Sequence, residues 1–399
     1  MKKVVALILA LCMCLTAALT VTAMADGIAK EDIKLGVITL HDELSTYDKN
    51  FIDAAKEAAA NMGLTEDQIK IVSGINEEEV CYDTAAELAE DGYNIIFADS
   101  FGHEDFMIKA AKEFPEVEFC HATGTKAHTE NIANFHNAFA SIYEGRFLAG
   151  VAAGMKLKQL QDEGKLKGET PLMGYVGAYP YEEVKSGYTS FFLGAKSIVP
   201  DVQMKVIFTQ SWYNEELEKT AAKSLIAANC DLISQHADSW GAPTACEEAG
   251  IPNVSYNMAT VEHCPNTYIA ASRINWVPYF EYIIAQRIAG EPIATDWTGN
   301  IETGSVELIS VNEQAAAPGT VEKVEEIKQK LLNGEVKVFD TATFTVNGET
   351  LTTAMANVDA DDAFTPDTEA IADGYFHESE FRSAPYFGID IDGIEILNN

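Results

Sequence analysis

The chain has 399 residues, enough for two domains, because one domain usually takes about 100–200 residues. It carries 27 basic and 62 acidic residues, a net charge of -35, so its surface repels phosphate backbones and anionic lipid headgroups. This charge argues against nucleic acid as a partner. Hydrophobic residues make up 47% of the chain, which is enough to build sizeable cores.

The first 25 residues have the pattern of a secretory signal peptide. Two lysines precede an uncharged run from Val4 to Ala25, and Ala23-Met24-Ala25 offers a small-x-small cleavage site. The alternative is an uncleaved anchor, because a run of this length could span a bilayer. Cys12 and Cys14 lack the small preceding residue that a lipid-modified cysteine requires. We therefore expect cleavage after Ala25, no lipoprotein, and a mature protein that is secreted or held at the cell surface.

The cysteines beyond this segment are predicted to be buried free thiols. Their number is odd and no C-x-x-C occurs, so neither a complete set of disulfides nor a zinc site is indicated. A chain of this size also builds its core without disulfides. The residues concerned are Cys81, Cys120, Cys230, Cys246 and Cys264.

From Lys34 onward, short apolar runs alternate with helical patterns. Such runs, without polar alternation and separated by helices, are typical of a parallel sheet covered on both faces. In the first series we expect strands at 33–40, 68–72, 94–98 and 117–121, and helices at 50–61, 77–90 and 104–114.

A second series follows a long predicted helix at 137–158. Its predicted strands are 172–176, 202–208, 231–235 and 253–256, and its helices are 182–198, 215–228 and 243–249. The fold class is therefore α/β, with two doubly wound units in tandem. Gly145, Gly150 and Gly154 in the long helix indicate close helix packing, because no G-x-G-x-x-G motif follows a strand.

We predict that residues 26–136 and about 300–340 form the first lobe, and that residues 137–299 form the second. The returning segment would contain a strand at 306–309, a helix at 321–332 with Thr320 as its N-cap, and a strand at 336–339. Residues 341–399 would add a hairpin with a type I′ turn at Asn347-Gly348, and an acidic tail with an edge strand at 389–397. Hinges between the lobes are expected near 131–137, 259–272 and 299–305.

Aromatic and polar side chains crowd the loops that follow the predicted strands, which is where open α/β sheets bind ligands. Flat rings suit a planar ligand, because stacking of a base on an aromatic ring contributes about 1–3 kcal/mol. Acids, amides and histidines can bond the polar edge of such a ligand in a dry cleft. The alternative is that single rings only cover the ends of the sheets. The candidate ligand-binding residues are Tyr47, Asp48, Phe51, Ser100, Phe101, His121, Tyr179, Trp212, His236, Asp238, Asn257, Asn275 and Trp276.

No catalytic motif accompanies these residues, since G-x-S-x-G and H-E-x-x-H are both absent. Asp359 and Asp361 suggest a calcium loop, but Ala363 and Phe364 stand where a ligand and a glycine are needed. We expect no enzyme activity, no metal and no cofactor. We interpret the pair Glu182-Glu183 as helix-start acids that complement the helix dipole.

Several long stretches carry the motifs of one protein family. They are ELAEDGYNIIFADSFGHEDFMIKAAKEFPEVEFCHATG (87–124), YEGRFLAGVAAG (143–154), GYVGAYPYEEVKSGYTSFFLGAKSIVPD (174–201), QSWYNEELEKTAAKSLI (210–226), LISQHADS (232–239) and INWVPYF (274–280). From about Lys34 to Phe339 the chain resembles the BMP family, the PnrA-like substrate-binding proteins of ABC transporters. The resemblance implies a type I periplasmic-binding-protein fold that captures a purine between two lobes. The protein would be a monomer that hands its ligand to a permease driven by a separate ATPase.

The resemblance also bears on the ligand. Nucleoside-binding members present an acidic residue and a lysine to the sugar, where this chain has Asn257 and Asn275. The loss of both charges favours a nucleobase over a nucleoside, and HADS with INWVPY resembles the branch associated with free bases such as adenine. The absent lipobox is a departure from the family.

In the resulting hypothesis, rings from the two lobes hold a purine between them. Tyr47 or Phe51 would lie on one side of the base, and Trp212 or Tyr179 on the other. The base edge would be bound by Asp238, His121, Asn257 and Asn275. Two alternatives stay open: an extracellular sensor that feeds a signalling receptor, and a nucleoside-processing enzyme.

Overall fold

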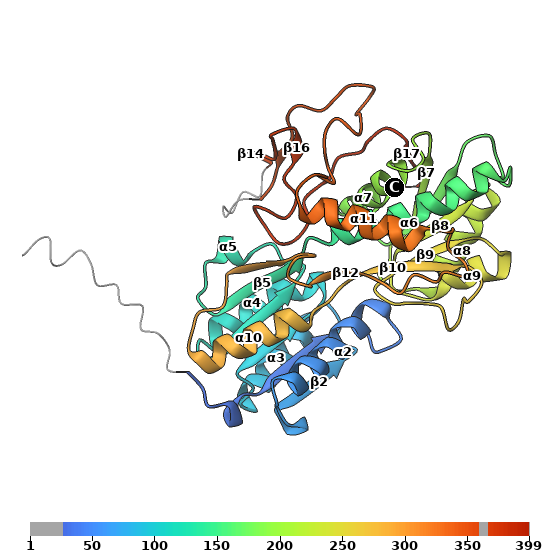
Figure 1. Cartoon of the computed structure of the whole chain (residues 1–399). Helices are drawn as coiled ribbons and strands as arrows, with labels where there is room; N and C mark the ends of the chain where they lie inside the picture. The colour runs from blue at the N-terminus through green and yellow to red at the C-terminus, as the bar shows by residue number, and fades with distance from the viewer. Residues whose placement is uncertain (1–26, 359–365, 399) are drawn as a thin grey trace, which may run out of the picture.

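The computed structural model describes residues 27–358 and 366–398 of the chain. The predicted signal peptide and the Asp359–Phe364 stretch lie outside these residues. Figure 1 shows two α/β lobes, with the C-terminal segment folded over one side of them. In the described part of the chain, no helix has the length and apolar composition needed to cross a membrane.

The first lobe is built on a six-stranded parallel sheet with the order β11-β5-β4-β3-β1-β2. Its strands are β1 (Leu35–Thr39), β2 (Ile69–Ser73), β3 (Ile95–Ala98), β4 (Glu118–Ala122), β5 (Phe135–Ala140) and β11 (Asp296–Gly299). Its helices are α2 (Thr46–Asn61), α3 (Glu79–Glu90), α4 (Glu104–Glu113), α5 (Ala127–Glu130) and α10 (Val277–Ala289), with short 3-10 helices at Lys30–Asp32, Glu66–Gln68 and Phe101–His103.

The second lobe is built on a seven-stranded sheet with the order β12-β10-β9-β8-β6-β7-β17. Its strands are β6 (Leu172–Gly177), β7 (Gln203–Phe208), β8 (Leu232–His236), β9 (Asn253–Tyr256), β10 (Tyr268–Ile274), β12 (Val306–Ile309) and β17 (Ile394–Ile396), and all pairs are parallel except β10 with β12. Its helices are α6 (Ile142–Asp162), α7 (Glu182–Lys196), α8 (Glu215–Ala227), α9 (Gly241–Ala249) and α11 (Thr320–Leu332).

Most predicted strands and helices have a counterpart, but β5 and β10 differ from the prediction. Residues 137–140 were assigned to the long helix, which begins only at Ile142. β5 is buried along its whole length, and a short apolar run cannot be told from a helix by its periodicity alone. β10 occupies a stretch that was expected to be a hinge. Residues 336–339 form no strand, and the N-cap of α11 is Gly319 instead of Thr320.

The sheet pairings also differ from the predicted division of the chain into lobes. α10 and β11, predicted in the second lobe, belong to the first, because β11 pairs with β5 and α10 packs against α2. β12 and α11, predicted in the first lobe, belong to the second, because β12 pairs with β10 and α11 packs against α6. The chain therefore crosses between the sheets after β5, after β10 and after β11.

α6 and α7 pack at very short range in the second lobe. A Cβ atom at Gly150 of α6 would lie 2.0 Å from the Phe191 carbonyl oxygen, and one at Gly194 of α7 would lie 2.1 Å from that of Phe147. Both obstacles are backbone atoms, which cannot rotate away as a side chain could. Of the three glycines predicted to allow close helix packing, Gly150 and Gly154 face α7, whereas Gly145 faces Val306 of β12 and Ser272 of β10.

We expect Gly150→Ala to lower the free energy of unfolding by about 1–3 kcal/mol or more, because the added methyl group forces two helix backbones apart. The matched control is Gly168→Ala, since a Cβ at Gly168 would lie 3.9 Å from its nearest neighbour, the Thr170 carbonyl oxygen. Urea denaturation of both variants measures the difference. Equal stability of the two would contradict the packing argument.

The five cysteines Cys81, Cys120, Cys230, Cys246 and Cys264 are buried free thiols, as predicted. Burial raises the pKa of the Cys120 thiol to about 12 and that of Cys264 to about 11. Within residues 27–358 and 366–398, no group of His, Cys, Asp or Glu side chains could hold a metal ion.

The C-terminal segment covers helices of the second lobe, and at its end it adds an edge strand to the sheet of that lobe. β17 pairs with β7, within the range predicted for an edge strand. Asn347 and Gly348 have φ values of 54° and 82°, as a type I′ turn requires, but the flanking residues form a single bridge instead of two strands. The described part of this segment also holds the short strands β13 (Met355–Ala356), β14 (Thr368–Glu369), β15 (Ile371–Ala372) and β16 (Tyr375–Phe376).

The C-terminal segment also touches both lobes. The Ser383 amide donates to Asp296 Oδ2 of the first lobe at 2.9 Å. Arg382 Nη2 lies 3.5 Å from Glu182 Oε2 of the second lobe. The segment therefore connects the lobes in addition to the three chain crossings.

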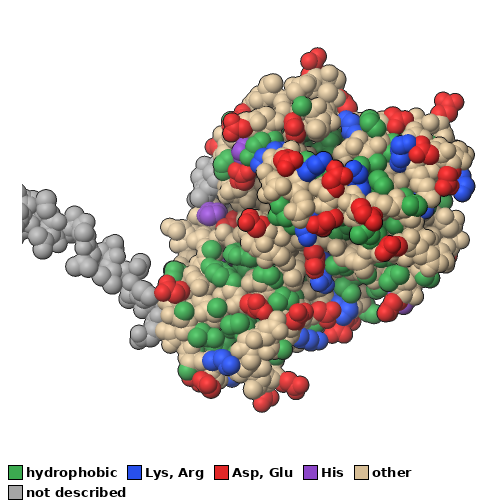
Figure 2. All heavy atoms as spheres, viewed as in Figure 1, with side chains coloured by type: hydrophobic (Ala, Val, Ile, Leu, Met, Phe, Trp, Pro, Cys, Tyr) green, Lys and Arg blue, Asp and Glu red, His purple; other side chains and the backbone are tan. Residues whose placement is uncertain are grey.

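Figure 2 shows acidic side chains spread over both lobes on the visible face, interspersed with lysine and arginine. Other carboxyl groups are buried. Burial raises the pKa of Glu144 and of Glu218 to about 7, and that of Glu378 to about 8. These groups therefore hold protons in the folded state at pH values where the unfolded chain has lost them.

We expect the free energy of unfolding to fall as the pH rises from about 5 to about 8, because these glutamates bind protons that the unfolded chain has lost. Burial lowers the pKa of three histidines, which acts in the opposite direction, but we expect the three glutamates, together with two buried aspartates of raised pKa, to outweigh them. The histidines are His103, His121 and His236, and the aspartates are Asp99 and Asp238. Glu218→Gln should reduce the fall by about 1–3 kcal/mol, since its amide does not titrate. Urea denaturation at the two pH values measures the effect, and Glu216→Gln on the solvent side of α8 is the control. Higher stability at pH 8 than at pH 5 would contradict this prediction.

Candidate ligand-binding site

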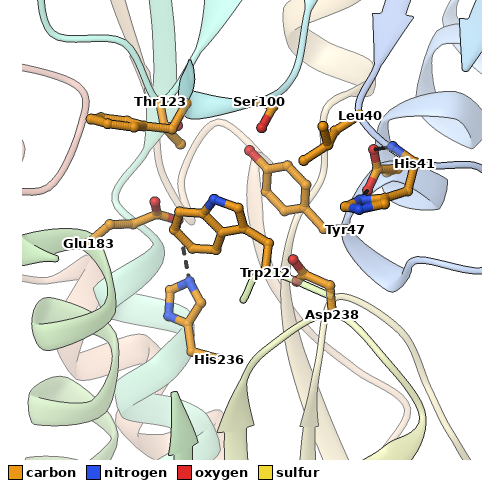
Figure 3. A pocket seen from close by; sticks show the side chains of 11 residues that line it. Leu40, His41, Tyr47, Ser100, Thr123, Glu183, Trp212, His236 and Asp238 are labelled. Atoms are coloured by element: carbon orange, nitrogen blue, oxygen red, sulfur yellow. Dashed lines mark hydrogen bonds and ion pairs between the residues drawn. The ribbon is translucent and has the colours of Figure 1, made fainter. Parts of the chain in front are cut away.

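A cavity lies between the lobes, at the carboxyl ends of the strands of both sheets. The space between its walls is about 370 Å³, part of it open to solvent, and the centre of a water molecule can reach about 20 Å³ of it. The first lobe contributes residues that follow β1, β3 and β4 and the start of α2, and the second lobe contributes the start of α7 and the residues at and after the ends of β7 and β8 (Figure 3). The lining residues are Leu40, His41, Tyr47, Asp48, Ser100, Phe101, Thr123, Glu183, Trp212, His236 and Asp238.

The two lobes are in direct contact beside this cavity. The Thr46 amide at the start of α2 donates to the Asp238 carbonyl oxygen at 2.8 Å. Asn50 Nδ2, one turn further along α2, donates to the Ile274 carbonyl oxygen at 2.7 Å. Two ring pairs also face each other across the boundary: His41 with Tyr213, with centroids 5.4 Å apart, and Phe101 with Tyr181, 5.7 Å apart. The cavity is thus closed by contacts from both lobes.

Asp48 fixes the loop before α2. Its Oδ1 accepts from the His41 amide at 2.7 Å, and its Oδ2 accepts from the Ser45 hydroxyl at 2.5 Å. Burial raises the pKa of Asp48, but these hydrogen bonds and the nearby His41 ring outweigh it and leave the pKa below its usual value. Both carboxylate oxygens are therefore engaged within the first lobe.

Tyr47 and Asp238 approach each other from opposite lobes (Figure 3). The Tyr47 hydroxyl donates to the Asp99 carbonyl oxygen at 2.8 Å, which fixes the ring at the cavity wall. Asp238 is 4% exposed, and no hydrogen bond to its carboxyl oxygens is present among the described residues. Burial, and next the charge of Asp48, raise the pKa of Asp238 well above its usual value. Asp238 therefore offers an unused polar group to the cavity.

His236 and Glu183 form a second polar pair in the wall. His236 Nε2 lies 3.3 Å from Glu183 Oε1, shown as a dashed line in Figure 3. Burial and the charge of Arg146 lower the pKa of His236, although Glu183 acts in the opposite direction. His236 is therefore neutral near pH 7 and can donate a hydrogen bond from Nε2 to Glu183.

Trp212 lies in the middle of the view in Figure 3, and a tyrosine cluster supports it. Its ring meets Tyr179 edge to face at 5.0 Å and Tyr181 at 5.9 Å, and the two tyrosines stack on each other at 5.1 Å. The Trp212 carbonyl oxygen accepts from the Asp238 amide at 3.0 Å, so the two loops are joined. The indole is thus held by side chains of its own lobe.

Seven of the thirteen predicted ligand-binding residues line the cavity. They are Tyr47, Asp48, Ser100, Phe101, Trp212, His236 and Asp238.

Of the others, Phe51 and Trp276 stack on each other at 4.4 Å in the core of the first lobe, and Tyr179 supports Trp212 from behind. His121 Nε2 bonds the Ser100 carbonyl oxygen at 2.7 Å, so it holds the loop that carries two lining residues.

The two asparagines that replace the charges of nucleoside-binding members also lie outside the cavity lining. Asn275 donates to the Gly304 carbonyl oxygen and accepts from the Val277 amide, so it joins two chain crossings. Asn257 takes a positive φ of 63° after β9 and is buried. The residue types at these two positions therefore do not indicate whether a ligand in this cavity carries a sugar.

Four lining residues were outside the predicted set: Leu40, His41, Thr123 and Glu183. Thr123 and Leu40 follow strands, as the predicted residues do. They were not predicted as ligand-binding residues because their side chains are less aromatic or less polar. Glu183 does lie in the first turn of α7 as expected, but this turn also points its carboxylate at the cavity. Only the position of its loop in the structure shows that His41 lines the cavity.

A comparison with known families agrees with this geometry. The family model of the Bmp proteins, described as PnrA-like ABC transporter substrate-binding proteins, matches residues 35–342. The chain belongs to the Bmp family. The match ends before most of the C-terminal segment.

Two curated relatives and one solved structure illustrate the similarity. The chain is 35% identical over 254 residues to the purine-binding protein BAB2_0673 of Brucella abortus, covering 63% of this chain and 67% of that one. It is 28% identical over 258 residues to the putative ABC transporter glucose-binding protein TsgA13 of Haloferax volcanii, covering 65% of this chain and 62% of that one. An ABC transporter solute-binding protein of Conexibacter woesei superposes with a TM-score of 0.62 at 18% identity, over 76% of this chain and 98% of that one. The expected periplasmic-binding-protein fold is thereby confirmed.

Proposed function

We propose that this Bmp-family substrate-binding protein captures a purine between its lobes, with a free nucleobase favoured over a nucleoside, for uptake by an ABC permease and its ATPase. The observation that carries the proposal is the cavity itself. It combines the indole of Trp212 and the ring of Tyr47 with the unbonded carboxyl of Asp238. Similarity to a relative named for purine binding supports the same ligand class.

The polar groups of the cavity favour a ligand that donates hydrogen bonds. Asp238 has no hydrogen bond to its carboxyl among the described residues, and Glu183 lines the cavity with a carboxyl group of which one oxygen meets His236. A free purine base has a ring N–H at the position where a nucleoside carries its sugar, so the base offers one more donor to such acceptors. A buried acceptor left unpaired costs about 1–3 kcal/mol, which penalises ligands without the matching donor.

The alternatives have less support. A metal-dependent nucleoside-processing enzyme would need a metal cluster at the cavity, and the described residues gather no such cluster. A sensor that feeds a signalling receptor would bind the same ligand, so it differs only in the partner of the lobe surfaces. We expect genes for a permease and an ATPase beside the gene of this protein.

We expect isothermal titration calorimetry of the purified protein to show binding of adenine or hypoxanthine, with weaker or no binding of adenosine, inosine and glucose. Trp212→Ala should weaken binding about 5- to 100-fold, because a stacked ring contributes about 1–3 kcal/mol. Asp238→Asn should weaken it by a similar factor, because the amide nitrogen replaces a carboxyl oxygen that could accept from the base, and an unpaired buried polar group costs about 1–3 kcal/mol.

Two controls separate ligand contact from stability. Trp240→Ala removes an indole that packs on His263 outside the cavity, and Asp201→Asn neutralises an exposed acid. Both should leave the affinity unchanged. No heat with any purine would contradict the ligand class, preference for nucleosides would contradict the base, and binding of glucose alone would make the protein a sugar receptor.

A further inference from the structure

Arg146 is a buried cation without an ion pair. It lies in the first turns of α6, is 1% exposed, and no carboxylate within 4.0 Å of it is present among the described residues. Its Nη1 donates to the Gln235 carbonyl oxygen at 2.9 Å, directly before His236. Its guanidinium carbon lies 3.3 Å from the centroid of the Tyr256 ring. A cation in such a position is costly unless a negative charge lies near, so its electrostatic partner must be sought further away.

Arg146 and His236 meet at one point on α7. A Cβ atom placed on Gly187 would lie 2.9 Å from His236 Nδ1 and 3.5 Å from Arg146 Nε. The two side chains also enclose Tyr256, because its ring lies 4.8 Å from the His236 ring and beneath the guanidinium. Neither His236 Nδ1 nor Arg146 Nε has a hydrogen-bond partner among the described residues. The cation therefore acts on Nδ1 through its field.

The opposite nitrogen of His236 faces Glu183 at 3.3 Å, and Glu183 lines the ligand cavity. Arg146 thus lies on the Nδ1 side of the His236 ring, and the Glu183 carboxylate lies on its Nε2 side. The remaining titratable groups around them are Tyr256 of β9, Tyr175 of β6, whose ring lies 6.0 Å from the guanidinium, and Asp238 on the loop after β8.

We propose that Arg146 is a positioning residue for the ligand site: it keeps a proton off Nδ1 of His236, so that the ring stays neutral, donates from Nε2 to Glu183, and holds that carboxylate toward the cavity. A cation beside a ring nitrogen disfavours a second proton on the ring, and the Glu183 carboxylate favours the proton on Nε2. Arg146 also places a positive charge on the far side of His236 from Glu183.

The ligand-free test is NMR of the protein with nitrogen-15-labelled histidine. Between about pH 5 and about pH 8, Nδ1 of His236 should resonate as an unprotonated nitrogen and Nε2 as a protonated one. In Arg146→Met, His236 should gain a second proton toward the acid end of this range, and Arg146→Lys should restore the neutral ring. A proton on Nδ1 of the wild-type protein, or an unchanged titration in Arg146→Met, would overturn the proposal.

A second arm rests on the proposed function and measures purine affinity against pH. The wild-type affinity should stay flat between about pH 5 and about pH 8, whereas that of Arg146→Met should fall about tenfold at the acid end, as a single linked proton requires. Arg146→Lys should recover the flat profile, and Arg273→Met, which removes a half-exposed arginine paired with Glu307, is the control. Equal weakening at every pH would show a structural role only. Absence of purine binding with the expected histidine spectrum would contradict the ligand and leave the role of Arg146 standing.

Discussion

The two lobes meet where the start of α2 bonds the loop after β8. Thr46 donates to the Asp238 carbonyl oxygen through its amide, and through its hydroxyl at 3.2 Å. Tyr47 and Asp48 follow Thr46 in the first turn of α2, and the Asp238 side chain leaves from the same residue that accepts these bonds. One backbone contact thus brings the ring of one lobe and the acid of the other to the same cavity. The geometry of the site depends on the lobes being in this arrangement.

The electrostatics of the site follow from burial. Asp238, Glu183 and Asp48 lie in or beside a small cavity between the lobes, yet the described residues place no lysine in its lining. Hydrogen bonds hold Asp48 ionised, whereas Asp238 is without them and its pKa is raised. The pKa values of two neighbouring acids of one type are therefore shifted in opposite directions, and a ligand meets both acids. The buried arginine behind His236 supplies positive charge from within the second lobe.

Much of the fold could be predicted from the sequence because parallel strands buried on both faces leave mostly apolar runs, as in β1 and β3. β5 was missed because its apolar run was joined to the helix that follows it, and β10 because its stretch was expected to be a hinge between the lobes. The lobe assignment of β11 and β12 was wrong for another reason. Strand pairing joins residues far apart in the chain, and the sequence of a four-residue strand does not indicate which strand it pairs with. The candidate site was predicted where a residue follows a strand, as with Trp212 and Asp238. Phe51 and Trp276 were misplaced because an aromatic ring near a strand end can turn toward either the core or the cavity.

The C-terminal segment bonds Asp296 through Ser383 and faces Glu182 through Arg382, while β17 is fixed to the edge of the second sheet. Separation of the lobes therefore has two outcomes. Either the Ser383–Asp296 hydrogen bond breaks, or the segment moves with the first lobe and strains the pairing of β17 with β7. In both cases the free energy of separating the lobes includes a contribution from residues after 342, where the match to the family ends. The free energy needed to open the cavity and release a ligand therefore depends partly on a segment outside the family match.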